Sequence, residues 1–170
     1  MRIIVALVML FAMFPAAAQT PPPPSERMAP FAALVGDWHG SGWIVTPQGR
    51  RAEVRSRETV TARLSGNALL VEGRHFEAGQ PDRLVHDAMA MIVWDAPTGA
   101  YRMRSALASG LNGDFAIEPR GETIAWAMDT PGGRIDYLIT ISGDTWIEHG
   151  TLTAPDGRQI AFMELRLTRQ

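Results

Sequence analysis

The 170-residue chain contains no cysteine and no lysine, and each absence excludes a kind of chemistry. Without cysteine there is no disulfide bond, no catalytic thiol and no lipid-anchored N-terminal cysteine. Without lysine, Schiff-base catalysis and a lysine-dependent P-loop are excluded. Every basic residue is an arginine, the net charge is -2, and no basic cluster follows one face of a segment. This charge pattern argues against nucleic acid as a partner.

Long apolar runs are scarce as well, and the only one lies at the N-terminus. Arg2 precedes an apolar run at residues 3–14, and the alanines at 16–18 offer a small-residue cleavage site before Gln19. The run is shorter than the ~20 apolar residues of a membrane-spanning helix. We interpret residues 1–18 as a signal peptide, with an uncleaved N-terminal anchor as the alternative. The expected location is therefore periplasmic or secreted, with no transmembrane segment after cleavage.

A proline-rich linker separates this segment from the predicted domain. Residues 19–25 include four consecutive prolines, which favour an extended polyproline-type chain and cannot pack a core. In the segment that follows, Phe31 and Leu34 recur at helical spacing and predict one or two helical turns, which the proline between Ala29 and Phe31 keeps short. We expect this short N-terminal helix to plug the open end of a domain that spans residues 26–170.

From residue 36 onward, short segments rich in β-branched and aromatic residues alternate with turns rich in glycine and proline. The turns leave ten strand candidates, at 37–46, 51–64, 69–78, 84–94, 101–108, 114–117, 123–128, 135–141, 145–153 and 159–168. Short turns throughout favour pairing between consecutive strands, and no helix of crossover length separates them. A Greek-key sandwich would need long crossover connections. The sequence therefore predicts an all-β, antiparallel, up-and-down β-barrel of about ten strands.

Alternation along the strand candidates separates two faces. In residues 51–63, arginines dominate one face, which we expect in solvent. The opposite face carries Ala52, Val54, Ser56, Glu58, Val60 and Ala62. In the last candidate, strict alternation places Phe162, Glu164 and Arg166 on one face and Met163, Leu165 and Leu167 on the other. Alternation alone does not determine which face of the later strands points inward.

Several motifs, taken together, resemble a known group of proteins. The segment Gly36-Asp37-Trp38-x-Gly40-x-Gly42 is similar to the first-strand signature of lipocalin-like (calycin) barrels, including nitrobindin-type barrels. Downstream, the chain resembles the DUF1579-like exported bacterial proteins of unknown function. The residues that carry this likeness are 93–105, Gly113-Asp114-Phe115, Trp146-x-Glu148 and Phe162-Met163-Glu164-Leu165-x-Leu167. The resemblance implies a lipocalin-like fold. Independently, a tryptophan at position 38 can cap the apolar interior while its indole N–H finds a carbonyl, and the nearby glycines let neighbouring backbone approach.

The resemblance also bears on cofactors. Nitrobindin-type barrels hold haem through a histidine close to the C-terminus, but residues 158–170 contain none. The four histidines of the chain lie in separate strand candidates, without the close spacing of metal ligands. His39-Gly40-Ser41-Gly42 is superficially similar to an oxyanion loop, yet the chain has no Gly-x-Ser-x-Gly nucleophile motif. We therefore expect no haem, no metal and no other cofactor.

Tryptophan and methionine, with five and nine copies in the chain, line adaptable apolar pockets as well as cores. A ten-stranded barrel is also wider than an eight-stranded one, which favours an internal cavity. We expect an exported, non-catalytic protein that binds a small apolar or amphipathic ligand inside the barrel. The predicted ligand-binding residues are Trp38, Arg104, Trp126, Tyr137, Trp146, Glu148 and Glu164. The three charged members would be polar anchors if they point inward, whereas outward-facing side chains would simply be solvated.

Two alternatives use the same barrel differently. An isomerase or hydrolase would use Glu148 or Glu164 as a general base, because an apolar barrel raises the pKa of a carboxyl group. An envelope interaction module would bind a protein through the proline arm or an exposed apolar patch on the outer face. The sequence assigns no catalytic residue beyond these carboxylates and leaves the ligand and the oligomeric state open.

Overall fold

The computed structural model describes residues 23–46 and 48–170, so the interpreted signal peptide and most of the linker lie outside the described residues. Ten strands follow one short helix, close to the predicted positions. The elements are η1 (Glu26–Leu34), β1 (Gly36–Val45), β2 (Arg51–Arg63), η2 (Leu64–Gly66), β3 (Ala68–Glu77), β4 (Leu84–Asp95), β5 (Ala100–Leu107), β6 (Asn112–Arg120), β7 (Thr123–Thr130), β8 (Gly133–Ser142), β9 (Thr145–Thr153) and β10 (Gln159–Arg169).

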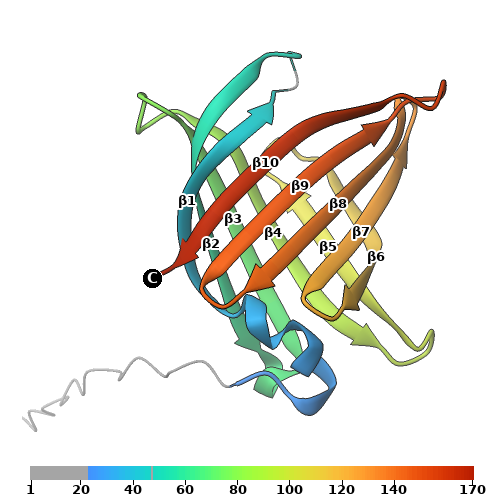
Figure 1. The fold of residues 1–170 in the computed structure, drawn as a ribbon. Helices are drawn as coiled ribbons and strands as arrows, with labels where there is room; N and C mark the ends of the chain where they lie inside the picture. The colour runs from blue at the N-terminus through green and yellow to red at the C-terminus, as the bar shows by residue number, and fades with distance from the viewer. Residues whose placement is uncertain (1–22, 47) are drawn as a thin grey trace, which may run out of the picture.

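All ten strands form one closed antiparallel barrel in which each strand pairs with its sequence neighbours and β1 pairs with β10 (Figure 1). Tight turns make this meander possible. Gly121 and Gly143, for example, adopt φ angles of 67° and 57° in the β6–β7 and β8–β9 hairpins, a conformation that glycine reaches without steric cost. The structure confirms the predicted up-and-down lipocalin-like barrel.

The closing pair of strands, β1 and β10, depends on two glycines. A Cβ atom added to Gly40 would lie 2.1 Å from the carbonyl oxygen of Arg166, and one added to Gly42 would lie 2.0 Å from that of Glu164. No side chain fits at such distances, so the two strands can approach only because these positions lack one. The glycines of the first-strand signature are therefore required for barrel closure.

The predicted N-terminal helix forms as the 3-10 helix η1 and covers one end of the barrel (Figure 1). Its side chains Met28, Phe31 and Leu34 are at most 1% exposed and pack into the core. Trp38, at the start of β1, is fully buried beneath them and donates its indole N–H to the Leu34 carbonyl at 2.8 Å. The proposed cap at the closed end of the barrel is thus confirmed.

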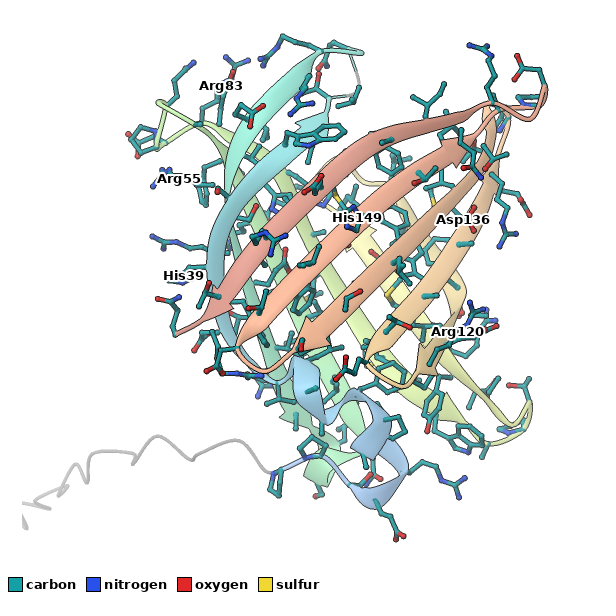
Figure 2. All side chains as sticks on the ribbon, in the orientation of Figure 1. His39, Arg55, Arg83, Arg120, Asp136 and His149 are labelled. Atoms are coloured by element: carbon teal, nitrogen blue, oxygen red, sulfur yellow. The ribbon has the colours of Figure 1, made fainter. Side chains whose placement is uncertain are left out.

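The faces of β2 show how the sequence pattern assigns the interior. Its apolar face is buried, whereas the arginines on the other face are exposed. The register carries this assignment from strand to strand, because directly paired residues share a face. Polar residues such as His39, Arg55 and His149 lie on outward-facing positions (Figure 2).

Two irregularities shape the end opposite η1. The β6–β7 ladder includes only Ile117–Arg120 and Thr123–Trp126, so the remaining described parts of these two strands are not paired with each other. In β10 the register shifts between Ala161 and Met163, which marks a β-bulge at Phe162. A bulge turns one side chain to the other face of its strand, contrary to strict alternation.

Candidate functional site

The barrel interior has a closed half and an accessible half. Near η1 the inward side chains are fully packed; Trp38 and Trp146 are 0% and 2% exposed, and their rings meet edge to face at 5.5 Å. Toward the opposite end the inward residues are only half-buried. They are Ala88, Ala90, Ser105, Leu107, Gly113, Phe115, Trp126, Met128, Ile135, Tyr137, Glu148 and Leu152. Space for solvent therefore extends into the barrel from this end.

An aromatic row crosses the wall of this accessible half. Phe115 on β6 contacts Trp126 on β7 with ring centroids 5.1 Å apart, and Trp126 stacks on Tyr137 of β8 at 3.9 Å. Phe162 meets Tyr137 edge to face at 5.5 Å. Its ring lies over Gly150 of β9, since a Cβ atom added there would be 2.5 Å from the ring. The glycine lets an aromatic ring from β10 cross β9 and complete the row.

Polar side chains lie on the opposite wall. Glu58 of β2 is 7% exposed, and its carboxylate occupies the space that a side chain at Gly73 would need. His75 of β3 is 4% exposed, lies 3.9 Å from the Glu58 carboxylate and stacks on His86 of β4 at 4.9 Å. Neither the Ser56 hydroxyl nor His75 Nδ1 has a hydrogen-bond partner within the described residues. The buried wall therefore offers unsatisfied polar atoms.

Glu148 of β9 points into the barrel beside the aromatic row. It accepts a hydrogen bond from the Trp146 indole N–H at 3.3 Å. Burial raises the pKa of Glu148 to about 7, and the indole hydrogen bond opposes this shift. Although its position is deep in the barrel, its side chain is only half-buried. Space large enough for water therefore adjoins this residue.

Burial shifts the pKa values of several interior side chains. Burial and, to a smaller extent, the negative charge of Glu148 raise the pKa of Glu58 well above its usual value. Burial and, to a smaller extent, the neighbouring His86 lower the pKa of His75 to about 3. Burial also lowers the pKa of His86. Burial and Glu148 raise the pKa of Tyr137 to about 12. At neutral pH the histidines and the tyrosine are therefore uncharged, and Glu148, whose pKa lies near neutrality, is the group whose charge changes around pH 7.

The structure brings together five of the seven predicted ligand-binding residues. Trp126, Tyr137 and Glu148 line the accessible half, whereas Trp38 and Trp146 belong to the packed closed end. The remaining two were expected as interior anchors and lie on the outer face, as the register determines. Arg104 is 74% exposed, and its Nε donates to Asp114 at 2.8 Å; Glu164 lies on the outer face of β10. Its outward position therefore excludes Glu164 as a general base acting inside the barrel.

The sequence did not predict the polar wall, formed by Ser56, Glu58, His75 and His86, or the aromatic residues Phe115 and Phe162. Glu58 and Ser56 share the apolar face of β2, so a charged residue on a buried face was an available signal. His75 likewise shares a face of β3 with Leu69 and Val71. Phe162, in contrast, was assigned to the face of Glu164 by strict alternation, and only the bulge places its ring against Tyr137.

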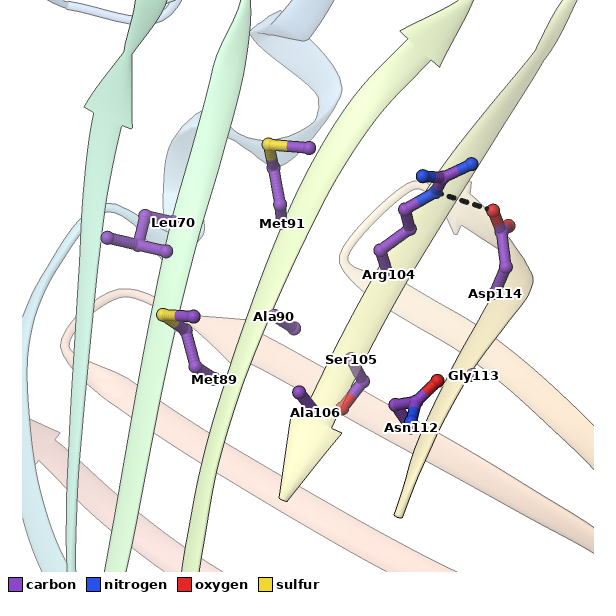
Figure 3. Close-up of a pocket in the computed structure, with 10 residues that line it drawn as sticks. All are labelled: Leu70, Met89, Ala90, Met91, Arg104, Ser105, Ala106, Asn112, Gly113 and Asp114. Atoms are coloured by element: carbon purple, nitrogen blue, oxygen red, sulfur yellow. Dashed lines mark hydrogen bonds and ion pairs between the residues drawn. The ribbon is translucent and has the colours of Figure 1, made fainter. Parts of the chain in front are cut away.

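A second concave feature lies on the outer face of β3–β6. It is an open groove of about 540 Å³, mostly lined by outward-facing side chains, with the Arg104–Asp114 ion pair at its edge (Figure 3). Met89 and Met91 contribute much of its apolar surface and are 51% and 39% exposed. The groove contains no buried polar side chain. The interior is therefore the stronger candidate site.

Within 23–46 and 48–170, no group of three histidine, aspartate or glutamate side chains is arranged to hold a metal ion. No helix in these same ranges is both long and apolar enough to span a membrane.

Comparisons with known proteins identify the fold. No family model and no curated protein matches the chain. Three solved structures share 11–17% sequence identity with it. Rv2717c from M. tuberculosis matches with a TM-score of 0.66 at 17% identity, covering 86% of this chain and 99% of that one. The S-type phycobiliprotein lyase CPES from Guillardia theta matches with a TM-score of 0.53 at 11% identity, covering 86% and 98%.

The third structure is zebrafish ileal bile acid-binding protein in complex with cholic acid, with a TM-score of 0.51 at 11% identity and coverage of 81% and 99%. These neighbours include lipocalin-like and calycin-like barrels, in agreement with the predicted fold. The narrower likeness to DUF1579-like proteins stays a prediction, because no family model matches.

Proposed function

We propose that this protein binds a small apolar or amphipathic molecule inside the barrel, without catalysis. The observation that carries the proposal is the half-buried state of Glu148 and its inward-facing neighbours, deep in a barrel whose other end is fully packed. Concave, mostly apolar spaces with a few polar groups are the usual form of ligand sites. The structural neighbour that binds cholic acid supports this use of the fold.

The accessible half offers both components of such a site. The aromatic row provides flat apolar surface, which contributes roughly 25 cal/mol per Å² removed from water. Glu148, Ser105 and the polar wall provide hydrogen-bonding groups that would fix a ligand's orientation. The unpaired parts of β6 and β7 lie at this same end, next to Phe115 and Met128. A ligand would therefore reach the interior at the end opposite η1.

Nile red, an uncharged dye whose emission shifts in apolar surroundings, tests the proposal. We expect saturable binding to the wild-type protein with a blue-shifted emission. Ser105 faces the interior and its neighbour Ala106 faces the outer groove, so Ser105→Phe and Ala106→Phe form a matched pair. Filling the interior with Ser105→Phe is expected to weaken dye binding at least about tenfold, which corresponds to about 1.4 kcal/mol.

Ala106→Phe should leave the dye affinity within about twofold of the wild type, since its ring lies outside the barrel. If Ala106→Phe abolishes binding and Ser105→Phe does not, the outer groove holds the dye and the proposal is wrong. Absence of any saturable binding to the wild-type protein would equally contradict it. Circular dichroism of both variants verifies that the barrel is folded.

A further inference from the structure

The interior has inward carboxyl groups but no arginine beside the deeper ones, and this imbalance suggests what the barrel selects. Within residues 23–46 and 48–170, the carboxyl and histidine side chains on inward strand positions are Glu58, His75, Glu77, His86 and Glu148, with Tyr137 close to Glu148. Glu77, at the end opposite η1, pairs with Arg50 and Arg83, each at 3.0 Å. The arginines of the strands occupy outward positions, apart from Arg169 at the closed end, which contacts Asp144 at 3.2 Å. Arginines therefore compensate Glu77, whereas no arginine within the described residues pairs with Glu58 or Glu148.

We infer that the ligand is a small organic cation, an amine or a protonated nitrogen heterocycle with an apolar body, whose positive nitrogen pairs with Glu148. The inference rests on the proposed function, because it names the chemical class of the ligand in the same interior. Apart from the Trp146 indole, Glu148 has no partner among the described residues, and a buried carboxylate without a charged partner favours a group that supplies positive charge.

The surroundings of Glu148 fit such a cation from several sides. Tyr137 lies close enough to Glu148 for that carboxylate to raise its pKa, and it stacks on Trp126 at 3.9 Å. Aromatic surface of this kind attracts a desolvated cation. Glu58 on β2 adds a second carboxyl group, close enough to Glu148 for the charge of Glu148 to contribute to its raised pKa. The apolar remainder of the row would hold the body of the ligand.

The same groups disfavour an anionic ligand. A carboxylate or sulfonate would approach Glu148 without an arginine beside that residue to pair with, and like charges in a low-dielectric space repel. Neutral histidines could donate a single hydrogen bond but supply no charge. The interior therefore discriminates by charge as well as by shape, with the cation preferred over a neutral molecule and the anion least favoured.

A probe series of constant shape tests this order. Three dansyl sulfonamides carry the same short alkyl chain, which ends in an ammonium, a methyl or a carboxylate group. We expect the ammonium probe to bind at least about tenfold more tightly than the methyl probe, and the carboxylate probe most weakly. If none of the three binds and Nile red does not bind either, the proposed function itself is wrong. If the methyl or carboxylate probe equals the ammonium probe, only the inference on charge is wrong.

Two variants assign the effect to Glu148. Glu148→Gln is expected to lower the affinity of the ammonium probe about tenfold and to leave the methyl probe within about twofold. Glu164→Gln, the same substitution on the outer face of β10, is the matched control and should change neither affinity. An ammonium preference that survives Glu148→Gln unchanged overturns the inference. Unchanged methyl-probe binding in Glu148→Gln shows that the variant is folded.

The pH dependence of the wild-type protein provides an independent readout. The groups that face Glu148 are the Trp146 indole on its own strand, Tyr137 on β8 and Glu58 across the barrel, with His75 and His86 beside Glu58. Ammonium-probe affinity is expected to rise between pH 5 and 8 as the carboxylates ionise, while the methyl-probe affinity stays flat. Equal pH profiles for the two probes would contradict the inference.

Discussion

Glu148 shows how one residue can couple the stability of the barrel to pH. In the unfolded chain its carboxyl group has an ordinary pKa near 4.5, whereas burial raises the folded-state value to about 7. The folded protein therefore holds a proton that the unfolded chain releases. For this group, stability is fully present below pH 4.5 and is lost as the pH rises toward 7. The raised pKa of Glu58 has the same effect on stability. The lowered pKa values of His75 and His86 have the opposite effect, because they reduce stability at pH values below the ordinary histidine pKa.

Replacing this carboxyl group by an amide removes its pH dependence. We predict that Glu148→Gln has nearly the same free energy of unfolding as the wild type at pH 4.5. At pH 8 we expect the variant to be more stable by about 2 kcal/mol. A pKa shift is worth ~1.4 kcal/mol per unit, and we reduce the full value because the side chain is partly solvated. Urea unfolding at both pH values measures the difference. A pH-independent offset for Glu148→Gln would refute the assignment.

At the scale of elements, the plug and the last strand stabilise each other. Arg169, at the end of β10, donates hydrogen bonds to the carbonyl groups of Ala33, at 2.9 Å, and Val35. Its guanidinium also lies 4.1 Å above the Trp38 ring, and Asp144 contacts it from the β8–β9 turn. One side chain thus fastens η1 to the closing strand pair. Because the plug buries Met28, Phe31 and Leu34, its attachment determines how tightly this end is sealed.

Removing this guanidinium should loosen the plug. We predict that Arg169→Ala lowers the free energy of unfolding by about 2 kcal/mol, the combined scale of one or two charged hydrogen bonds and a cation–π contact. Thermal or urea unfolding measures the loss, and hydrogen exchange should become faster in η1. Arg166→Ala, an exposed arginine on the same strand, is the control with an expected change below about 0.5 kcal/mol. If Arg169→Ala and Arg166→Ala change the free energy of unfolding equally, the contacts of Arg169 make no specific contribution, and η1 is held by its apolar contacts alone.

At the scale of the whole molecule, the barrel is packed at one end and accessible at the other, and residues 1–18 have the sequence pattern of a signal peptide. We propose that the protein is exported, since the sequence of residues 1–18 has the charge, length and cleavage chemistry of a signal peptide. A periplasmic or secreted binding protein could meet ligands outside the cytoplasm without disulfide bonds, because a barrel of this size buries a substantial core.

Export predicts a defined N-terminus for the mature protein. When the full chain is expressed with its own leader, we expect the protein recovered from the periplasm or medium to begin at Gln19, with an intact mass lower by residues 1–18. Mass spectrometry of the fractionated protein measures this. A leaderless form, expressed from residue 19, should remain in the cytoplasm and is the control. Full-length protein retained at the membrane would instead support the uncleaved anchor.

The sequence by itself determined the architecture, because its patterns are local. Turn residues at regular intervals and period-two alternation required consecutive antiparallel strands, and the spacing of Phe31 and Leu34 indicated the helical plug. Trp38 was assigned to the closed end for the same kind of reason, since a large ring after a glycine can cap an apolar interior. Each of these inferences uses residues close together in the chain, for which the sequence is sufficient information.

Only the tertiary structure decided which candidate residues form a site. Arg104 and Glu148 were equivalent in the sequence, each a charged residue in a strand of apolar neighbours, but the register of the closed barrel turns Arg104 to solvent and Glu148 inward. The β-bulge moved Phe162 to the interior, where Gly150 leaves room for its ring. Inward orientation depends on the pairing of all ten strands at once. A local pattern therefore cannot show that Glu58, His75 and Glu148, from three distant segments, share one interior.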